Sequence, residues 1–149
     1  MLTEAIDLES LRQRIEDAEY ESGSMSDFID LGRPDAPARR NAQETILKRD
    51  KEAKDLKEQL KKLIQVSPPT AVEEWVNFHT AILLRIIQEP VTDANIRTRQ
   101  TVAKTTLKHW EEVSAGTRDY VGINWHFLKD YKAEVRRTRS SKNWWGIWK

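Results

Sequence analysis

The sequence contains no cysteine, and none of its asparagines begins the Asn-x-Ser/Thr pattern that N-glycosylation requires. The lack of cysteine excludes disulfide bonds and thiolate metal ligands. Acidic residues occupy the start of the chain, where a secretory signal needs basic residues followed by an apolar run. The longest strongly apolar stretch, residues 81–87, contains Arg85 and is far shorter than the ~20 residues that span a bilayer. We therefore expect a cytoplasmic or intracellular protein, neither secreted nor transmembrane.

Glycine is also scarce, with 5 residues scattered singly among the 149. The phosphate-binding pattern G-x-x-x-x-G-K-S/T, the dinucleotide-binding turn G-x-G-x-x-G and the nucleophile elbow G-x-S-x-G need closely spaced glycines. None of the three patterns occurs. We therefore expect no nucleotide-dependent enzyme and no cofactor.

The three histidines are the side chains that titrate closest to neutral pH, so any acid–base or metal site would start from them. A helical metal site needs two ligands spaced by three or four residues. The nearest approaches are His109 with Glu112 and His126 with Asp130, in the reverse order to the Glu-x-x-His of di-iron bundles. We predict no metal site, no catalytic residue and no small-molecule substrate, and expect the histidines, His79 included, to lie beside tryptophans of the core.

Hydrophobic residues make up 38% and charged residues 33% of the chain, a balance that suits thin helices with much surface. The net charge of +1 hides a gradient, because residues 1–35 carry ten acids and three bases while residues 118–149 carry eight bases and three acids. A chain polarised in this way can pack head to tail with copies of itself, or offer its basic end to phosphates or to an acidic protein. Alternatively, the acidic start folds against the basic end.

The first third of the chain predicts a helical hairpin. A helix capped by Thr3 is expected to run to about Glu21, with one apolar stripe at Leu8, Leu11, Ile15 and Ala18. Gly, Ser and Pro concentrate in residues 22–37, which predicts a loop. Three apolar residues of that loop are too hydrophobic for a free linker and are expected to dock: Phe28, Ile29 and Leu31.

Residues 38–65 are rich in strong helix formers and contain neither Gly nor Pro, so they predict the clearest helix of the sequence. Apolar residues follow the a/d spacing of a coiled coil over about three heptads, with Arg49 at one seam position. So narrow a seam buries against one or two helices, and we predict self-association through it. The seam consists of Ala42, Ile46, Ala53, Leu56, Leu60 and Leu63.

Two adjacent prolines at 68 and 69 end that helix and mark a domain boundary. Thr70 and Glu73 form a capping-box pattern, which predicts a third, central helix to about Glu89. Thr92 or Asp93 is expected to cap a fourth helix that ends near 115, before Gly116, and a fifth helix is predicted over residues 117–140. The predicted fold is all-α. It comprises an antiparallel coiled-coil hairpin (1–66), a small three-helix bundle (67–140) and a Trp-rich tail (141–149).

The C-terminal end places large aromatic rings beside positive charges. Such residues suit a membrane interface, single-stranded nucleic acid or a protein groove, or else the tail folds back onto its own bundle. We predict a non-enzymatic structural or adaptor subunit of a larger assembly that uses this end to bind a protein. The alternative is a peripheral membrane or single-stranded nucleic-acid-binding module acting through the same residues. The predicted contact residues are Arg136, Arg137, Arg139, Lys142, Trp144, Trp145, Ile147, Trp148 and Lys149.

Overall fold

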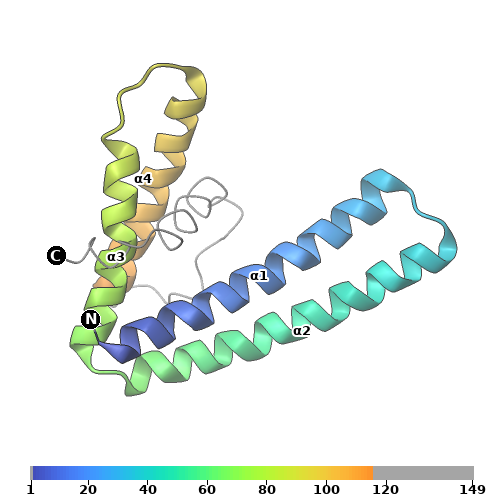
Figure 1. Cartoon of the computed structure of the whole chain (residues 1–149), viewed down its shortest axis with the longest axis horizontal. Coiled ribbons are helices and arrows are strands. Elements are labelled where there is room, and N and C mark those ends of the chain that lie inside the picture. The colour runs from blue at the N-terminus through green and yellow to red at the C-terminus, as the bar shows by residue number, and fades with distance from the viewer. Residues whose placement is uncertain (1, 116–149) are drawn as a thin grey trace. The chain divides into compact units, whose positions relative to one another are not determined.

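The computed structural model describes residues 2–115, which form four α-helices and no strand (Figure 1). The helices are α1 (Thr3–Gly32), α2 (Ala36–Val66), α3 (Pro69–Ile87) and α4 (Ala94–Ser114). The all-α fold class is therefore confirmed. The predicted fifth helix and the tail lie outside the described residues.

The chain divides into two compact units. The hairpin unit spans Asp7–Ser67 and contains most of α1 and all of α2. The second unit combines Met1–Ile6 with the chain from Pro68 onward, and its described part contains α3 and α4; we call it the α3/α4 unit. Within that unit the backbone N–H of Leu2 donates to Glu74 Oε2 at 3.1 Å, which ties the start of the chain to α3.

The loop predicted over residues 22–37 is wrong, because α1 continues to Gly32 and only residues 33–35 connect it to α2. The inward residues of α1 alternate in steps of three and four, and the series does not stop at Ala18 but continues through Ser22, Met25 and Ile29. Ser22 is buried and Met25 and Ile29 are partly buried. Tertiary packing on this face overrides the local preference of Ser and Gly for turns.

The helices α1 and α2 pair antiparallel, as expected for a hairpin (Figure 1). Glu21 forms an ion pair with Arg49 at 2.8 Å, and Glu19 forms one with Lys57 at 2.5 Å. Earlier residues of α1 therefore meet later residues of α2, which fixes the antiparallel direction. α1 carries nine acids and two bases and α2 nine bases and five acids, so opposite charges meet inside the hairpin.

The boundaries of α2 follow from local chemistry. Arg33 adopts φ 45°, a left-handed conformation that turns the chain at the end of α1. Asp35 then caps α2, because its side chain accepts a hydrogen bond from the N–H of Ala38 at 3.0 Å. At the other end, the N–H of Ser67 bonds to the carbonyl of Leu63, and the two prolines prevent the helix from continuing.

The capping box predicted for α3 is wrong. Pro68 is the N-cap residue, no side chain caps the helix, and Thr70 lies inside its first turn. Proline fits there because its fixed φ suits a helix start and the missing N–H would have had no intrahelical partner. For α4 the expected cap at Asp93 is confirmed, since its carboxylate accepts from the N–H of Ile96 at 3.0 Å.

Aromatic rings from both helices form the core of the α3/α4 unit. His79 is fully buried and stacks on Trp110, with ring centroids 4.3 Å apart and planes 7° from parallel. Trp75 meets the edge of Trp110 at 5.2 Å, and Phe78 meets His79 at 5.1 Å. Packed rings at such distances stabilise the contact beyond the burial of their area alone. His79 therefore lies beside tryptophans of the core, as the sequence predicts.

A buried glutamine joins the two helices at their connected ends. The side-chain amide of Gln100 donates to the carbonyl of Glu89 at 2.6 Å and to that of Ile86 at 3.3 Å. Ile86 lies in the last turn of α3 and Glu89 lies two residues beyond its end, where carbonyls lack the donors that a continuing helix would supply. A polar side chain on the inner face of α4 thus caps the C-terminal end of α3.

Candidate interaction surfaces

The predicted contact residues of the C-terminal end lie outside the described residues. This applies to every member of the set: Arg136, Arg137, Arg139, Lys142, Trp144, Trp145, Ile147, Trp148 and Lys149. Their contacts with a partner stay a prediction.

The predicted self-association seam lies on the inner side of α2. Ala42, Ala53, Leu56 and Leu60 are buried, and Ile46 and Leu63 are partly buried. The cross-pairs between the helices lie along this side, so α1 occupies it. Self-association through the seam would require a second copy to displace α1, and it stays a prediction.

The hairpin exposes large apolar side chains on its outside instead. Leu31 on α1 is 82% exposed, Leu47 on α2 is 73% exposed and Phe28 on α1 is 43% exposed. An exposed leucine is ordinary in isolation, but clustered apolar residues on a helix edge are typical of interaction sites. The sequence signal was present for Phe28 and Leu31, which are too apolar for a linker. Nothing in the sequence indicated that Leu47 lies on an interaction surface, because Leu47 is not one of the a/d positions of the seam.

Phe28 and Leu31 belong to a set of residues with the spacing i, i+3, i+4 and i+7, which shares one face of a helix. We call this set, together with the neighbouring acid Asp30, the acidic edge of α1. Asp27, Phe28, Asp30 and Leu31 are exposed, and Ser24 at the base of the set is partly buried. The acidic edge consists of Ser24, Asp27, Phe28, Asp30 and Leu31.

Leu47 lies among charges of both signs on the outer side of α2, and cations are in excess. Arg40, Lys51 and Lys54 lie on its stripe at spacings of seven, four and seven residues, and all are exposed. We call Arg40, Leu47, Lys51 and Lys54 the basic edge of α2. Two exposed acids, Glu44 and Asp50, lie three residues before and three residues after Leu47. In the described part of the chain, no ion pair involves Asp27, Asp30 or any cation of the basic edge.

A polar layer interrupts the inner side of the hairpin at its middle. Ser22 Oγ donates to Asp50 Oδ1 at 2.5 Å, and Arg49 reaches Glu52 at 2.6 Å in addition to Glu21. The hydrogen bond to Glu52 and the nearby charge of Glu21 raise the pKa of Arg49, so it stays cationic throughout the working pH range. Polar groups in an otherwise apolar seam favour one register, because a shifted pairing would leave them without these partners.

A second ionic network runs along the first half of α1. Arg12 is 1% exposed, and its guanidinium donates to Glu9 at 2.6 and 3.1 Å and to Glu16 at 2.9 Å. The three residues share one helix face through their spacing of three and four. Buried charges of this kind add little net stability, although loss of one member costs about 3–5 kcal/mol. The pattern Glu-x-x-Arg-x-x-x-Glu is visible in the sequence, but nothing there indicates its burial.

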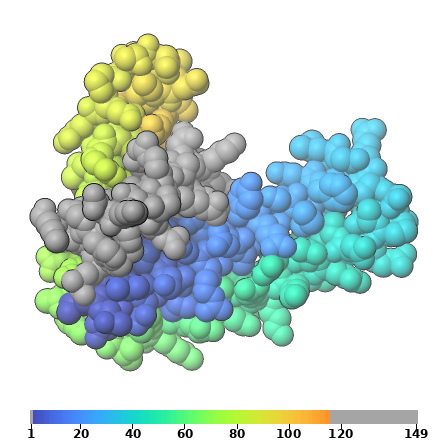
Figure 2. Space-filling model, in the orientation of Figure 1, coloured from blue at the N-terminus to red at the C-terminus, as the bar shows by residue number. Residues whose placement is uncertain are grey.

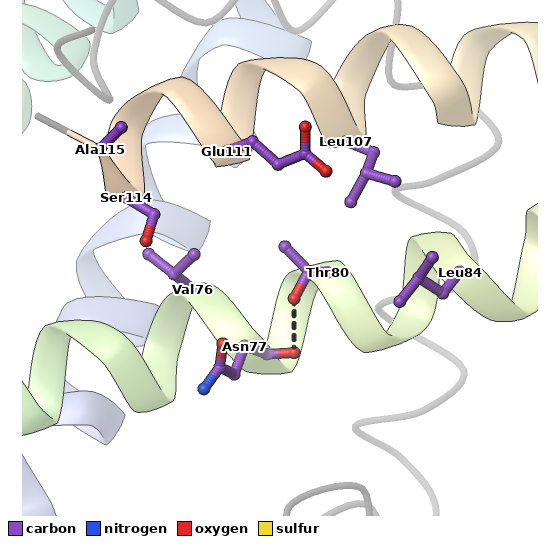
Figure 3. A pocket seen from close by; sticks show the side chains of 8 residues that line it. All are labelled: Val76, Asn77, Thr80, Leu84, Leu107, Glu111, Ser114 and Ala115. Carbon is purple, nitrogen blue, oxygen red and sulfur yellow. Dashed lines mark hydrogen bonds between the residues drawn. The ribbon is translucent and has the colours of Figure 1, made fainter. Parts of the chain in front are cut away.

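The α3/α4 unit contains a shallow groove of about 430 Å³ between its helices (Figure 3). Val76, Leu84 and Leu107 supply its apolar surface, while Thr80 and Glu111 supply polar atoms. The hydroxyl of Thr80 already donates to the carbonyl of Asn77 at 3.1 Å, which leaves its oxygen as an acceptor. Apolar side chains of a peptide or helix fit such a lining, with Asn77 and Glu111 available for hydrogen bonds. The remaining lining residues are Ser114 and Ala115.

Within residues 2–115, no group of three or more His, Asp or Glu side chains is arranged to hold a metal ion. His109 on α4 is partly buried, and His126 lies outside the described residues. No described helix is both long enough and apolar enough to cross a membrane.

Comparison of the chain with protein-family models, with curated proteins and with solved structures gave no match.

Proposed function

We propose that this protein is a non-enzymatic structural or adaptor subunit that binds other proteins through the outer edges of its hairpin and through its C-terminal end. The observation that carries the proposal is the exposure of Leu31, Leu47 and Phe28 on helices whose own pairing uses other residues. Their exposure leaves apolar area in water, which a partner would cover with a gain of free energy.

The form of the hairpin suits this role. Two helices of about 30 residues extend roughly 45 Å each at 1.5 Å per residue, and the edges occupy about 10 Å of α1 and about 21 Å of α2. In the space-filling view the hairpin presents a long surface that partners can contact (Figure 2). The inner seam and its polar layer hold the edges in place, and a preformed surface loses less entropy on binding than a flexible one.

The C-terminal residues add a second contact in this proposal. Trp and Arg are the residue types that most often dominate the energy of protein interfaces. The sequence gathers Trp144, Trp145 and Trp148 within five residues, after Arg136, Arg137 and Arg139.

Affinity capture with the full chain tests the contribution of the C-terminal end. We expect the variant W144A/W145A/W148A to lose at least one protein that the unchanged chain retains. A matched control, K142A/K149A, removes the flanking charges and keeps the rings, and it separates ring packing from electrostatic attraction. Identical sets of retained proteins for the unchanged chain and the tryptophan variant would exclude this contact.

A further inference from the structure

The two outer edges of the hairpin carry opposite charges, and each also exposes large apolar side chains. The acidic edge of α1 combines Asp27 and Asp30 with Phe28 and Leu31, and the basic edge of α2 combines three cations with Leu47. They lie on different helices, and among the described residues no ion pair joins one edge to the other. We propose that the acidic edge of one copy of this chain binds the basic edge of a second copy.

The spacing of the acidic edge provides a place for Leu47 of the second copy. Four residues at i, i+3, i+4 and i+7 surround a hole that accepts one side chain from a neighbouring helix. Here Ser24, Asp27, Phe28 and Leu31 take these positions over about 10 Å of helix. Phe28 and Leu31 form apolar walls, and the small Ser24 leaves room for the leucine. Leu47 is the large apolar residue of the basic edge.

The acidic charges around the hole favour a partner helix that carries cations. A leucine surrounded by acids would bring like charges together, which costs free energy in the contact. Leu47 lies four residues before Lys51 and seven before Lys54, so cations accompany it on the same stripe. These cations meet Asp27 and Asp30 when Leu47 fills the hole. Because these side chains form no ion pair within the described chain, the contact breaks no existing pair.

The contact joins two different surfaces, so it is heterologous and leaves an unused edge at each end. Such contacts build rings or open chains of copies and not only closed dimers. Few apolar residues take part, so the contact belongs with weak interfaces and depends on concentration. Salt weakens it, because exposed charges more than about 8 Å apart are screened at physiological ionic strength.

Sedimentation velocity with charge-reversed full chains tests this inference. We expect the unchanged chain to associate as its concentration rises. D27K/D30K makes both edges basic and K51E/K54E makes the basic edge acidic, so each variant alone should associate at least tenfold more weakly. An equal mixture of the two should associate again, because each edge of one variant, whether unchanged or reversed, then meets an edge of opposite charge on the other variant. The recovery also shows that both variants are folded.

The control K104E/K108E makes the same change of net charge on exposed residues of α4, outside the hairpin, and should associate like the unchanged chain. Replacement of Leu47 by Gln should weaken association about tenfold or more, as expected for the loss of a buried leucine. A chain that stays monomeric at every concentration, or a mixture no better than its components, would overturn the inference.

The inference rests on the proposed function, and its failure can be told apart from failure of that function. The chain could be monomeric at every concentration and still retain a foreign protein that the variant L31S/L47S does not retain. That result would support the adaptor role and exclude self-association. A chain that associates through its edges but retains no foreign protein keeps this inference and restricts the role to self-assembly.

Discussion

Gly23 shows how the environment of a single residue decides the structure of α1. Glycine favours turns in a sequence, yet here it lies within a helix, and a Cβ added to it would meet no atom within 4 Å. The buried residue beside it, Ser22, bonds to Asp50 across the hairpin. This cross-helix contact is invisible in the sequence of α1 alone, which explains why residues 22–37 were predicted as a loop.

Replacement of Gly23 by Ala is expected to stabilise the protein by about 0.5–1 kcal/mol, since alanine loses less backbone entropy in a helix and finds open space here. The free energy of unfolding from urea titration, followed by circular dichroism, measures the change. Gly32, at the last position of α1, offers a comparison because its added Cβ would contact Phe28 at 3.4 Å. A loss of stability in G23A would mean that residue 23 needs a conformation other than the helix.

At the scale of the element, strong periodicity predicted helices well and local end signals predicted their boundaries unevenly. α2 was expected over 38–65 and spans Ala36–Val66, because dense helix formers and two prolines define it from within. Thr92 or Asp93 was predicted as a cap, and Asp93 is the cap. Thr70 was predicted as a cap from the same kind of pattern, but the proline pair moves the start of α3 upstream.

The two cap residues give a paired prediction at this scale. D93A should lower the free energy of unfolding by about 1 kcal/mol, because the N–H of Ile96 loses its acceptor. T70A should change it by less than about 0.5 kcal/mol, since Thr70 makes no capping hydrogen bond. Urea titrations of both variants measure the difference. Equal losses for the two would contradict the described start of α3.

The sequence also predicts in part which face of a helix is buried against its partner helix. The a/d seam of α2 was predicted residue by residue, and its members are buried or partly buried. The buried polar residues Arg12, Gln100 and Thr106 were not predicted, because hydrophobic periodicity does not register polar side chains that pack inward. Their burial depends on partners in three dimensions, such as the carbonyl of Glu89 for Gln100.

At the scale of the whole molecule, the charge gradient of the sequence has a structural use within the hairpin. The acidic start was expected to meet the basic end, either of its own chain or of a second copy, or else the basic end was expected to bind phosphates or an acidic protein. In the hairpin, the acids Glu19 and Glu21 pair with cations of α2. The outer edges carry Asp27 and Asp30 of α1 and Arg40, Lys51 and Lys54 of α2. The surface that the sequence favoured for foreign partners, the tail, lies outside the described residues. Of the apolar residues on the edges, Phe28 and Leu31 gave a signal in the sequence, whereas Leu47 is found only from its exposure.

The most direct test of the central claim, that the outer edges of the hairpin bind protein partners, is affinity capture with the full-length variant L31S/L47S. Leu31 and Leu47 are among the most exposed apolar residues of the hairpin, so their replacement should leave its folding intact. The control V66S alters a residue that is 78% exposed but lies on neither edge. We predict that the unchanged chain and V66S retain the same proteins, counting untagged copies of the chain, and that L31S/L47S loses at least one of them. Retention of the same proteins by all three chains would contradict the account.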